Sequence, residues 1–227
     1  MFTGLLSELC KTAMSTSATP QARPRKERKD NADRRRRQLI EATLRSVVSN
    51  GLAKTTLATV ATEAGLSQGV AVFYFKTKDE LLAEALAHQY ALYEDNWTAN
   101  LDQASDDPAE QLSALIIADF SPEVCNRETL AVWFAFWGEA KFRPRYAETS
   151  REFEDRRGNE IKAICAQLMQ GAPDQDVDQI ATFIDSMTDG LWQRIYLSPD
   201  RFTNADALAT TFRLLRNLFP AHANHFP

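Results

Sequence analysis

The sequence predicts an all-α protein of about nine helices, and three observations indicate this class. From Asp33 onward, apolar residues recur three to four positions apart, which is the spacing of one face of a helix. Stretches that contain Gly, Pro or Asn interrupt this spacing, and no alternating apolar and polar stretch stands out as a strand. The chain is 44% hydrophobic and 25% charged, as expected for an ordinary globular protein.

The N-terminal part of the chain predicts an irregular arm followed by three helices. Residues 1–32 are rich in Ser, Thr, Pro and Arg without apolar periodicity, so we expect them to be disordered or to become ordered on binding. A first helix begins near Asp33, carries an apolar stripe and ends at Asn50-Gly51. A second covers Leu57–Ala64 after Thr55-Thr56 as possible N-caps, and a third begins at Ser67.

The remaining periodicity predicts six more helices. A long helix begins near Thr77 and continues to Leu101, and Asp106-Asp107-Pro108 then ends one helical pattern and starts the next. The other predicted helices are Ala109–Phe120, Arg127–Ala140, a charged surface helix over Arg145–Met169, and two strongly periodic segments, Val177–Ile195 and Ala205–Phe219.

Charge is divided unevenly along the chain. Residues 1–37 contain ten Lys or Arg and four Asp or Glu, a net charge of +6, whereas the other 190 residues carry −11. This asymmetry indicates that a polyanion binds at the N-terminal end and a different partner binds elsewhere. A solubilising or cloning-derived tail remains the alternative interpretation of the basic run.

The segment Thr55–Leu82 has the pattern of a helix-turn-helix. Gly65 can adopt a left-handed turn, Leu66 would fill the junction, and the Ser67 hydroxyl would cap the following helix. Gln68, Ala71 and Phe73 would then project away from the body. In a helix-turn-helix, this second helix lies in the DNA major groove with its N-terminal residues at the base edges. An ordinary helical hairpin with a glycine turn would have the same spacing.

These residues also resemble a known family. Gly65-Leu66-Ser67, Gly69, Tyr74-Phe75, Lys78 and Leu81 are similar to the signature of TetR-type transcriptional repressors, and the resemblance covers about residues 34–220. Within that family, two further motifs resemble the choline-responsive BetI-type repressors of glycine betaine synthesis: residues 133–137, WFAFW, and residues 189–194, DGLWQR. One position departs from the family pattern, because Val72 stands where a tyrosine is usual.

The helix-turn-helix interpretation assigns a role to each predicted DNA-contacting residue. Gln68 can donate to and accept from adenine, and Val70 or Ala71 can meet a thymine methyl group. Thr56, Tyr74 and Lys78 are predicted phosphate contacts, which set the register on the duplex. The cluster of arginines would approach the backbone, and the arm from Arg23 to Lys29 would enter the minor groove. The full predicted set is Arg34, Arg35, Arg36, Arg37, Thr56, Ser67, Gln68, Gly69, Val70, Ala71, Phe73, Tyr74 and Lys78.

Aromatic residues in the second half predict a pocket for a small effector. Trp133, Phe136 and Trp137 share one helical face, Tyr90, Tyr93 and Trp97 form a second stripe, and Trp192 lies on the penultimate helix. Indole and phenol faces attract quaternary ammonium groups, and Glu139 and Asp189 are possible counter-charges. Plain core packing of the aromatics is the alternative. The resemblance to the choline-responsive repressors implies an effector such as choline.

These features predict three parts: the basic arm 1–32, a DNA-binding domain 33–79, and a ligand-binding and dimerisation domain 80–227. The resemblance implies that the last two helices pair in a homodimer, whose symmetry would match a palindromic operator. The expected function is a ligand-responsive repressor of transcription. An all-helical protein-binding adaptor is the alternative, and a helical enzyme is a third option.

Several other classes of site are not expected. No nucleophile, acid and base stand at a suggestive catalytic spacing, the three histidines lack zinc-ligand spacing, and no GxGxxG or GxxxxGK motif is present, so no enzyme, metal or cofactor is predicted. The longest uncharged stretch, Ala64–Phe75, is too short to span a membrane. Three widely spaced cysteines and a first decapeptide without an apolar core favour a cytoplasmic protein.

Overall fold

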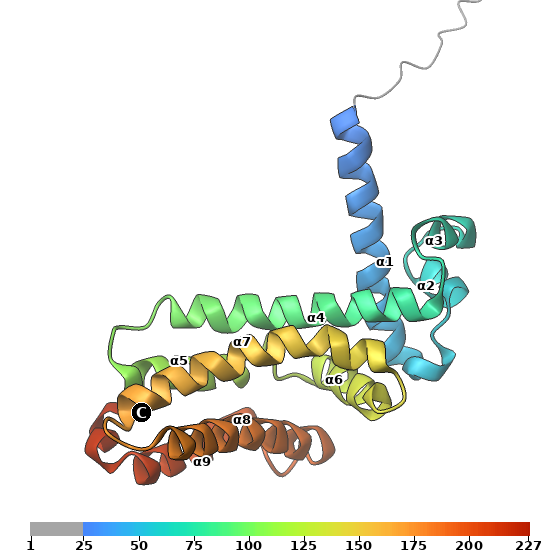
Figure 1. Ribbon diagram of the computed structural model, residues 1–227. Helices are drawn as coiled ribbons and strands as arrows, with labels where there is room; N and C mark the ends of the chain where they lie inside the picture. Colours follow the sequence, from blue (N-terminus) through green and yellow to red (C-terminus); the bar gives the residue numbers. More distant parts are fainter. Residues whose placement is uncertain (1–24) are drawn as a thin grey trace, which may run out of the picture. The chain divides into compact units, whose positions relative to one another are not determined.

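The computed structural model describes residues 25–227, and its regular elements in this range are helices without a strand (Figure 1). Within residues 25–227, nine α-helices are followed by a short 3₁₀ helix, η1 (Pro220–His225). The predicted all-α class is therefore confirmed. None of the helices in the described range is both long and apolar enough to cross a membrane.

The first helix, α1 (Arg25–Lys54), begins before Asp33, where the sequence placed its start. The residues between the two positions are mostly Arg, Lys, Glu and Ala, which favour helix, so the prediction that they are irregular was wrong. The earlier part of the predicted arm lies outside the described residues. The chain divides between Arg35 and Arg36 into two units; in the first, Arg34 donates a hydrogen bond to Asn31.

The second unit, residues 36–227, begins with the helix-turn-helix. Near the end of α1, Gly51 has a φ of +75°, where the regular helix is interrupted. The next helix, α2 (Leu57–Glu63), begins with a capping box in which the Thr56 hydroxyl accepts from the Thr59 amide. Gly65 has a φ of +64°, and Ser67 then caps α3 (Gln68–Tyr74) as predicted. A small core holds the motif together, formed by Leu39, Ala42, Val60, Ala61, Ala64, Ala71, Phe75 and Leu81.

The larger part of this unit is a bundle of six helices. These are α4 (Lys78–Leu101), α5 (Pro108–Asp119), α6 (Arg127–Ala140), α7 (Pro144–Leu168), α8 (Asp174–Leu197) and α9 (Asn204–Leu218). The seventh helix packs against α4, α5, α6 and α8, so it is central to the bundle. Its buried apolar residues include Ile161, Ile164 and Cys165.

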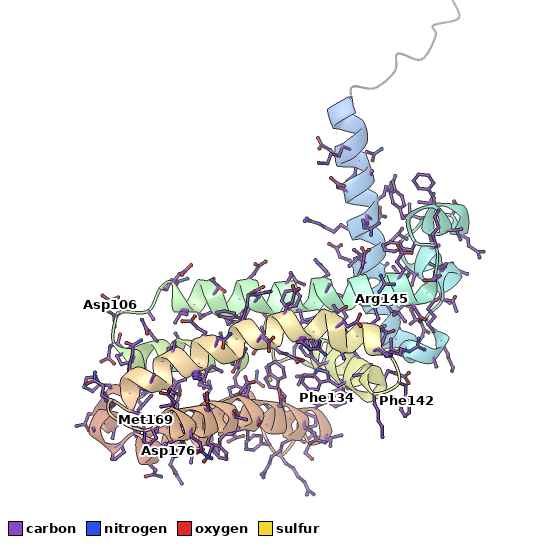
Figure 2. All side chains as sticks on the ribbon, viewed as in Figure 1. Asp106, Phe134, Phe142, Arg145, Met169 and Asp176 are labelled. Atoms are coloured by element: carbon purple, nitrogen blue, oxygen red, sulfur yellow. The ribbon has the colours of Figure 1, made fainter. Side chains whose placement is uncertain are left out.

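The central position of α7 corrects the prediction of a charged surface helix. Because α7 contains many charged residues, its apolar stripe is difficult to recognise in the sequence. One of these charged residues, Arg157, is itself only 5% exposed. The turn before it, between α6 and α7, exposes the ring of Phe142 (Figure 2), which is 75% accessible to solvent. Pro144 then occupies the first turn of α7, where proline is tolerated because a backbone N–H at this position would have no helical partner.

Candidate functional site

The recognition helix of the helix-turn-helix presents an exposed face. Gln68 and Gly69 are exposed at its N-terminal end, and Phe73 is 70% and Val72 42% exposed further along. Such exposure of large apolar side chains is unusual on a free surface, and base edges with thymine methyl groups are one surface they can cover. Val70 is partly buried beside them.

Three of the predicted DNA-contacting side chains are engaged inside the protein. Ala71 is fully buried in the small core, so it cannot reach a base. The Lys78 ammonium donates to the carbonyls of Leu52 and Ala53 at 2.6 and 3.0 Å. It therefore caps the C-terminal end of α1, where carbonyl groups lack helical partners. These hydrogen bonds disfavour the prediction that Lys78 contacts a DNA phosphate.

Arg36 likewise has partners within the fold. Its guanidinium forms an ion pair with Glu84 on α4, donates to the Tyr74 carbonyl at 3.4 Å and lies over the Phe75 ring at 4.7 Å. These contacts tie α1 to α3 and α4. The neighbouring Arg37 is exposed in the same unit. Arg34 and Arg35 belong to the first unit, where Arg34 is exposed and Arg35 partly buried.

The other predicted residues of the motif are positioned by caps and partial burial. Thr56 and Ser67 are exposed N-cap residues, and their hydroxyl groups accept from backbone amides. Tyr74 is partly buried against the core and makes an edge contact with Phe73. One exposed cation was missed: the Lys76 ammonium bonds the carbonyls of Val72 and Phe73 at the end of α3. Lys76 directly follows Tyr74-Phe75, and this position in the sequence is the signal that could have added it to the predicted set.

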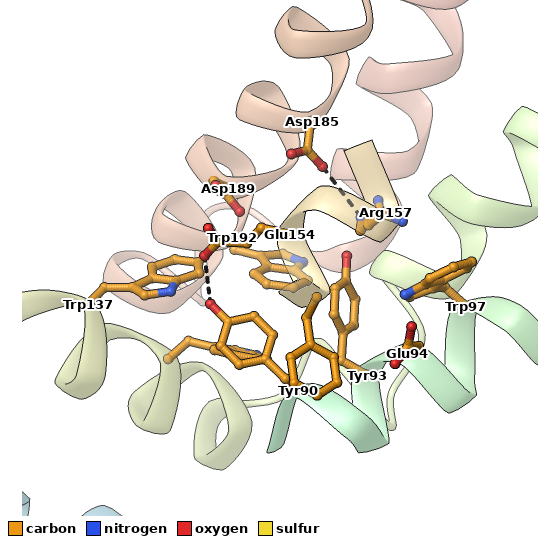
Figure 3. Close-up of a pocket in the computed structure, with 12 residues that line it drawn as sticks. Tyr90, Tyr93, Glu94, Trp97, Trp137, Glu154, Arg157, Asp185, Asp189 and Trp192 are labelled. Carbon is orange, nitrogen blue, oxygen red and sulfur yellow. Dashed lines mark hydrogen bonds and ion pairs between the residues drawn. The ribbon is translucent and has the colours of Figure 1, made fainter. Parts of the chain in front are cut away.

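A cavity of about 340 Å³ lies within the bundle (Figure 3). This volume falls in the usual range of small-molecule pockets, about 300–1,000 Å³. Its lining side chains come from α4, α6, α7 and α8: Tyr90, Tyr93, Glu94, Trp97, Trp133, Trp137, Phe153, Glu154, Arg157, Asp185, Asp189 and Trp192. Seven are aromatic, and the polar members are mostly acidic.

Three of the tryptophans lie with nearly parallel rings. The centroids of Trp133 and Trp137 are 5.8 Å apart with planes at 27°, and Trp137 and Trp192 are 6.4 Å apart at 13°. Tyr90 and Tyr93 present their rings edge-on to Trp133, at 4.6 and 6.0 Å. Ring faces carry negative potential, so this arrangement forms a wall that attracts a cation.

A buried polar network lies behind the aromatic wall. Arg157 Nη2 donates to Asp119 Oδ2 at 2.6 Å, and the Tyr93 hydroxyl donates to Asp119 Oδ1 at 2.8 Å. The Trp192 indole donates to the Asp119 carbonyl at 2.9 Å. Burial raises the pKa of Asp119 to about 6, while Arg157 and Tyr93 oppose the rise, so the carboxylate is ionised at neutral pH. The network fixes the orientation of Tyr93, Arg157 and Trp192.

The rest of the lining makes the cavity acidic. The Tyr90 hydroxyl donates to Glu154 at 2.8 Å, and Asp185 forms a 3.4 Å ion pair with Arg157. Asp189 lies at the rim, where the residue is exposed. Although the residue as a whole is exposed, neighbouring atoms remove part of the water around its carboxylate, and this raises its pKa to about 7. Repulsion from Asp185, Asp119 and Glu154 adds to the rise, and Arg157 opposes it. Four carboxylates against one guanidinium favour a cation in this cavity.

Seven of the nine predicted ligand-binding residues line the cavity, and two do not. Phe136 is 1% exposed and packs edge-on against Tyr146, with centroids 5.2 Å apart. Glu139 accepts a hydrogen bond from Arg143 at 3.2 Å, outside the cavity. At about 100° per residue, Phe136 and Glu139 lie about 60° and 120° around α6 from Trp133, on the side opposite to Trp137, so both point away from the aromatic wall.

Sequence reasoning missed five lining residues: Glu94, Phe153, Glu154, Arg157 and Asp185. Three of them lie on α7, which was assigned to the surface because of its charge. The signal available was the pair of neighbours Phe153 and Arg157, which stand four positions apart and therefore share a helical face.

A helix-turn-helix joined to a helical bundle with a pocket of small-molecule size defines a class: DNA-binding transcriptional regulators that respond to small molecules. Comparison of the sequence with known protein families gives the same class. Residues 39–85 match the family of bacterial regulatory proteins of the tetR type, and residues 108–220 match the C-terminal domain of BetI-type transcriptional repressors. The chain belongs to the TetR family and is a BetI-type transcriptional repressor. Members of this family bind operator DNA and small effectors, which decides against the adaptor and enzyme alternatives.

Individual relatives and solved structures agree with this assignment. The HTH-type transcriptional regulator BetI of Paraburkholderia xenovorans is 33% identical over 184 residues, which cover 78% of this chain and 89% of the relative. A transcriptional regulator from Pseudomonas aeruginosa PAO1 superposes with a TM-score of 0.76 at 25% identity, over 86% of this chain and 95% of that one. A regulator from Saccharomonospora viridis, solved in complex with choline, has the same fold, with a TM-score of 0.69 at 23% identity over 85% and 97%.

Proposed function

We propose that this repressor binds its operator as a homodimer and is released when a small quaternary ammonium compound such as choline enters the cavity. The observation that carries the proposal is the lining itself: four tryptophans, two tyrosines and a phenylalanine surround a space bordered by four carboxylates. Cation–π attraction in a desolvated site contributes about 2 kcal/mol or more. The choline complex of the Saccharomonospora viridis regulator, which has the same fold, supports this choice of ligand.

The proposed DNA-binding surface consists of the recognition helix and the basic residues before it. Gln68 and Val70 read bases, Thr56 and Ser67 lie near phosphates at the helix N-termini, and the exposed Arg37 contacts the backbone. Residues 33–79 form the DNA-binding domain and residues 80–227 the effector domain. The basic segment before residue 33 adds phosphate contacts, and the protein acts in the cytoplasm on chromosomal DNA.

The proposed dimer forms through α8 and α9. The eighth helix exposes Phe183 and Leu197, which are 48% and 68% accessible. Apolar side chains of this size are stabilised by contact with a second copy of the same surface. A two-fold dimer would place two recognition helices on successive turns of a palindromic operator.

The test combines calorimetry with a gel shift on the DNA upstream of the protein's own gene. Choline should bind the purified protein and weaken the operator complex, by a coupling of about 1–3 kcal/mol, and the DNA should weaken choline binding by the same factor. The uncharged isostere 3,3-dimethylbutan-1-ol is the control and should do neither. If the isostere acts as well as choline, or if neither changes the gel shift, the aromatic residues serve only as core.

A further inference from the structure

The exposed side of the recognition helix α3 is apolar. At about 100° per residue, Gly69, Val72 and Phe73 lie on the side that turns away from the buried Ala71. Gly69 is exposed, Val72 is 42% exposed and Phe73 is 70% exposed. These three residues are called the apolar face of α3 below. The side chains of Val72 and Phe73 neither donate nor accept a hydrogen bond, so a polar partner does not explain their exposure.

The Phe73 ring is held in position by its neighbours without being buried by them. The Tyr74 ring lies edge-on to it, with centroids 5.1 Å apart and planes at 87°. The Lys76 ammonium lies 5.8 Å from the centroid of the Phe73 ring and bonds the carbonyls of Val72 and Phe73 at 3.4 and 3.2 Å. A partner therefore meets an ordered apolar surface, and little side-chain freedom is lost when it binds.

Packing inside the protein does not explain why residue 69 is a glycine. Gly69 is not among the glycines with a positive φ, so its backbone conformation is open to other residues. A Cβ built at this position would meet only the Oγ of Ser67, at 3.8 Å, which is an ordinary contact. Alanine would therefore fit and would favour the helix. A residue without a side chain instead lets a partner approach the backbone of α3 closely.

The charge of α3 and its place in the motif favour DNA as the partner of the apolar face. No residue of α3 is acidic, and Lys76 adds an exposed cation just beyond its C-terminal end. The apolar face is continuous with the exposed Gln68 at the start of the same helix. This second helix of a helix-turn-helix is the element that lies in the major groove.

The chemistry of the major groove determines which base the apolar face fits. Thymine presents a methyl group there, whereas the edges of guanine, adenine and cytosine present hydrogen-bond donors and acceptors. Covering those polar edges with Val72 or Phe73 would remove their water without supplying a partner, which is unfavourable. Successive bases of one strand lie about 3.4 Å apart, so the two side chains can cover neighbouring thymines.

We propose that the apolar face of α3 recognises the 5-methyl groups of neighbouring thymines, so that Val72 and Phe73 determine operator specificity and each half-site contains two adjacent thymines. This inference rests on the proposed function, because it presupposes operator binding through α3. It adds a second kind of specificity. Gln68 distinguishes a base by hydrogen bonds, whereas the apolar face distinguishes thymine by a group that forms none.

The first test compares two versions of the DNA upstream of the protein's own gene, made with thymidine or with deoxyuridine, in gel shifts with the full-length protein. Deoxyuridine keeps the base-pairing groups and lacks only the methyl group. Burial of one methyl group contributes about fourfold in affinity. A dimer that covers at least one methyl group in each half-site should therefore bind the deoxyuridine version about tenfold or more weakly. Random DNA of the same composition is the control, and its affinity should change little.

The second test uses variants of exposed residues. Phe73→Ala should bind the thymidine DNA about tenfold more weakly and should lose most of the preference over deoxyuridine. Leu92→Ala is the matched control, because Leu92 is an apolar residue on α4 that is 48% exposed; affinity and preference should both remain. Gly69→Ala should keep or raise the melting temperature and weaken operator binding, because its Cβ hinders the close approach.

The outcomes separate this inference from the proposed function. Equal affinities for the two versions of the upstream DNA, or a Phe73→Ala variant that keeps the full preference, would overturn the recognition of thymine and leave operator binding intact. If the protein binds neither version better than random DNA, the proposed operator binding fails together with this inference. An unchanged operator affinity in Gly69→Ala would remove Gly69 from the contact with DNA.

Discussion

Asp119 and Arg157 form the ion pair that joins α5 to α7 behind the cavity, and Asp119→Asn tests how strongly the fold depends on it. Asp119 is 0% exposed, the side chain of Arg157 is 6% exposed, and the two groups are 2.6 Å apart. The substitution keeps the size of the side chain but removes its charge. Arg157 then retains Asp185, 3.4 Å away with a side chain 45% exposed, as its remaining anionic partner.

The expected loss follows from the burial of the pair. Removing one partner of a buried ion pair leaves an uncompensated charge and costs about 3–5 kcal/mol of unfolding free energy. For a chain of this size, each kcal/mol lowers the melting temperature by about 2–4 °C, so the variant should melt about 6–20 °C lower. The pKa of Asp119 is raised, which means that attraction to Arg157 does not fully compensate its carboxylate for the hydration lost on burial. Replacing both residues in Asp119→Leu/Arg157→Met should therefore recover much of the loss.

Urea and thermal unfolding at neutral pH measure both variants. The matched control is Glu94→Gln, which breaks the pair formed with Arg156, the arginine next to Arg157 on the same helix. In that pair the side chains are 26% and 46% exposed, so its loss should cost less than about 1 kcal/mol. Equal losses for Asp119→Asn and Glu94→Gln, or a double variant no more stable than Asp119→Asn, would refute the reasoning.

Three further predictions concern DNA and pH. Gln68→Ala should cost about 1–3 kcal/mol on the operator and much less on random DNA, measured by gel shift; equal losses would mean that Gln68 reads no base. Lys78→Met should lower the melting temperature and leave the slope of log K against log salt unchanged, whereas a phosphate contact would flatten it by about 0.9. Choline affinity should rise up to about tenfold from pH 6 to pH 8, because Asp189, with its pKa near 7, changes from mostly protonated to mostly ionised. Solvent at the rim screens this effect, so tenfold is the upper end; a slope that survives in Asp189→Asn would assign it to another group.

The helices and the helix-turn-helix could be predicted because their signals are local. The cap at Ser67 and the left-handed turn at Gly65 depend on residues a few positions apart, and both have the predicted geometry. Ala71 illustrates the limit of that reasoning. A small apolar side chain on a short helix can face a base or the core, and only packing against Val60 and Phe75 in the folded motif decides between them.

The aromatic half of the cavity could also be predicted, whereas its polar half could not. Trp133 and Trp137 share a helical face by spacing alone, and tryptophan is rare enough to draw attention. In the sequence, by contrast, Arg157 is only one of many charged residues in α7. Its burial follows from a pairing with Asp119, 38 positions earlier, and no local pattern encodes a contact at that separation.

The cavity contains every tryptophan of the chain: Trp97, Trp133, Trp137 and Trp192. Because no other indole is present, the tryptophan fluorescence of the whole protein comes entirely from residues that line this cavity. The close, nearly parallel rings of Trp133, Trp137 and Trp192 should also couple their electronic transitions and produce a strong near-ultraviolet circular dichroism signal. Occupancy of the cavity can therefore be followed optically in the unlabelled protein, and a molecule that enters any other pocket should leave both spectra nearly unchanged.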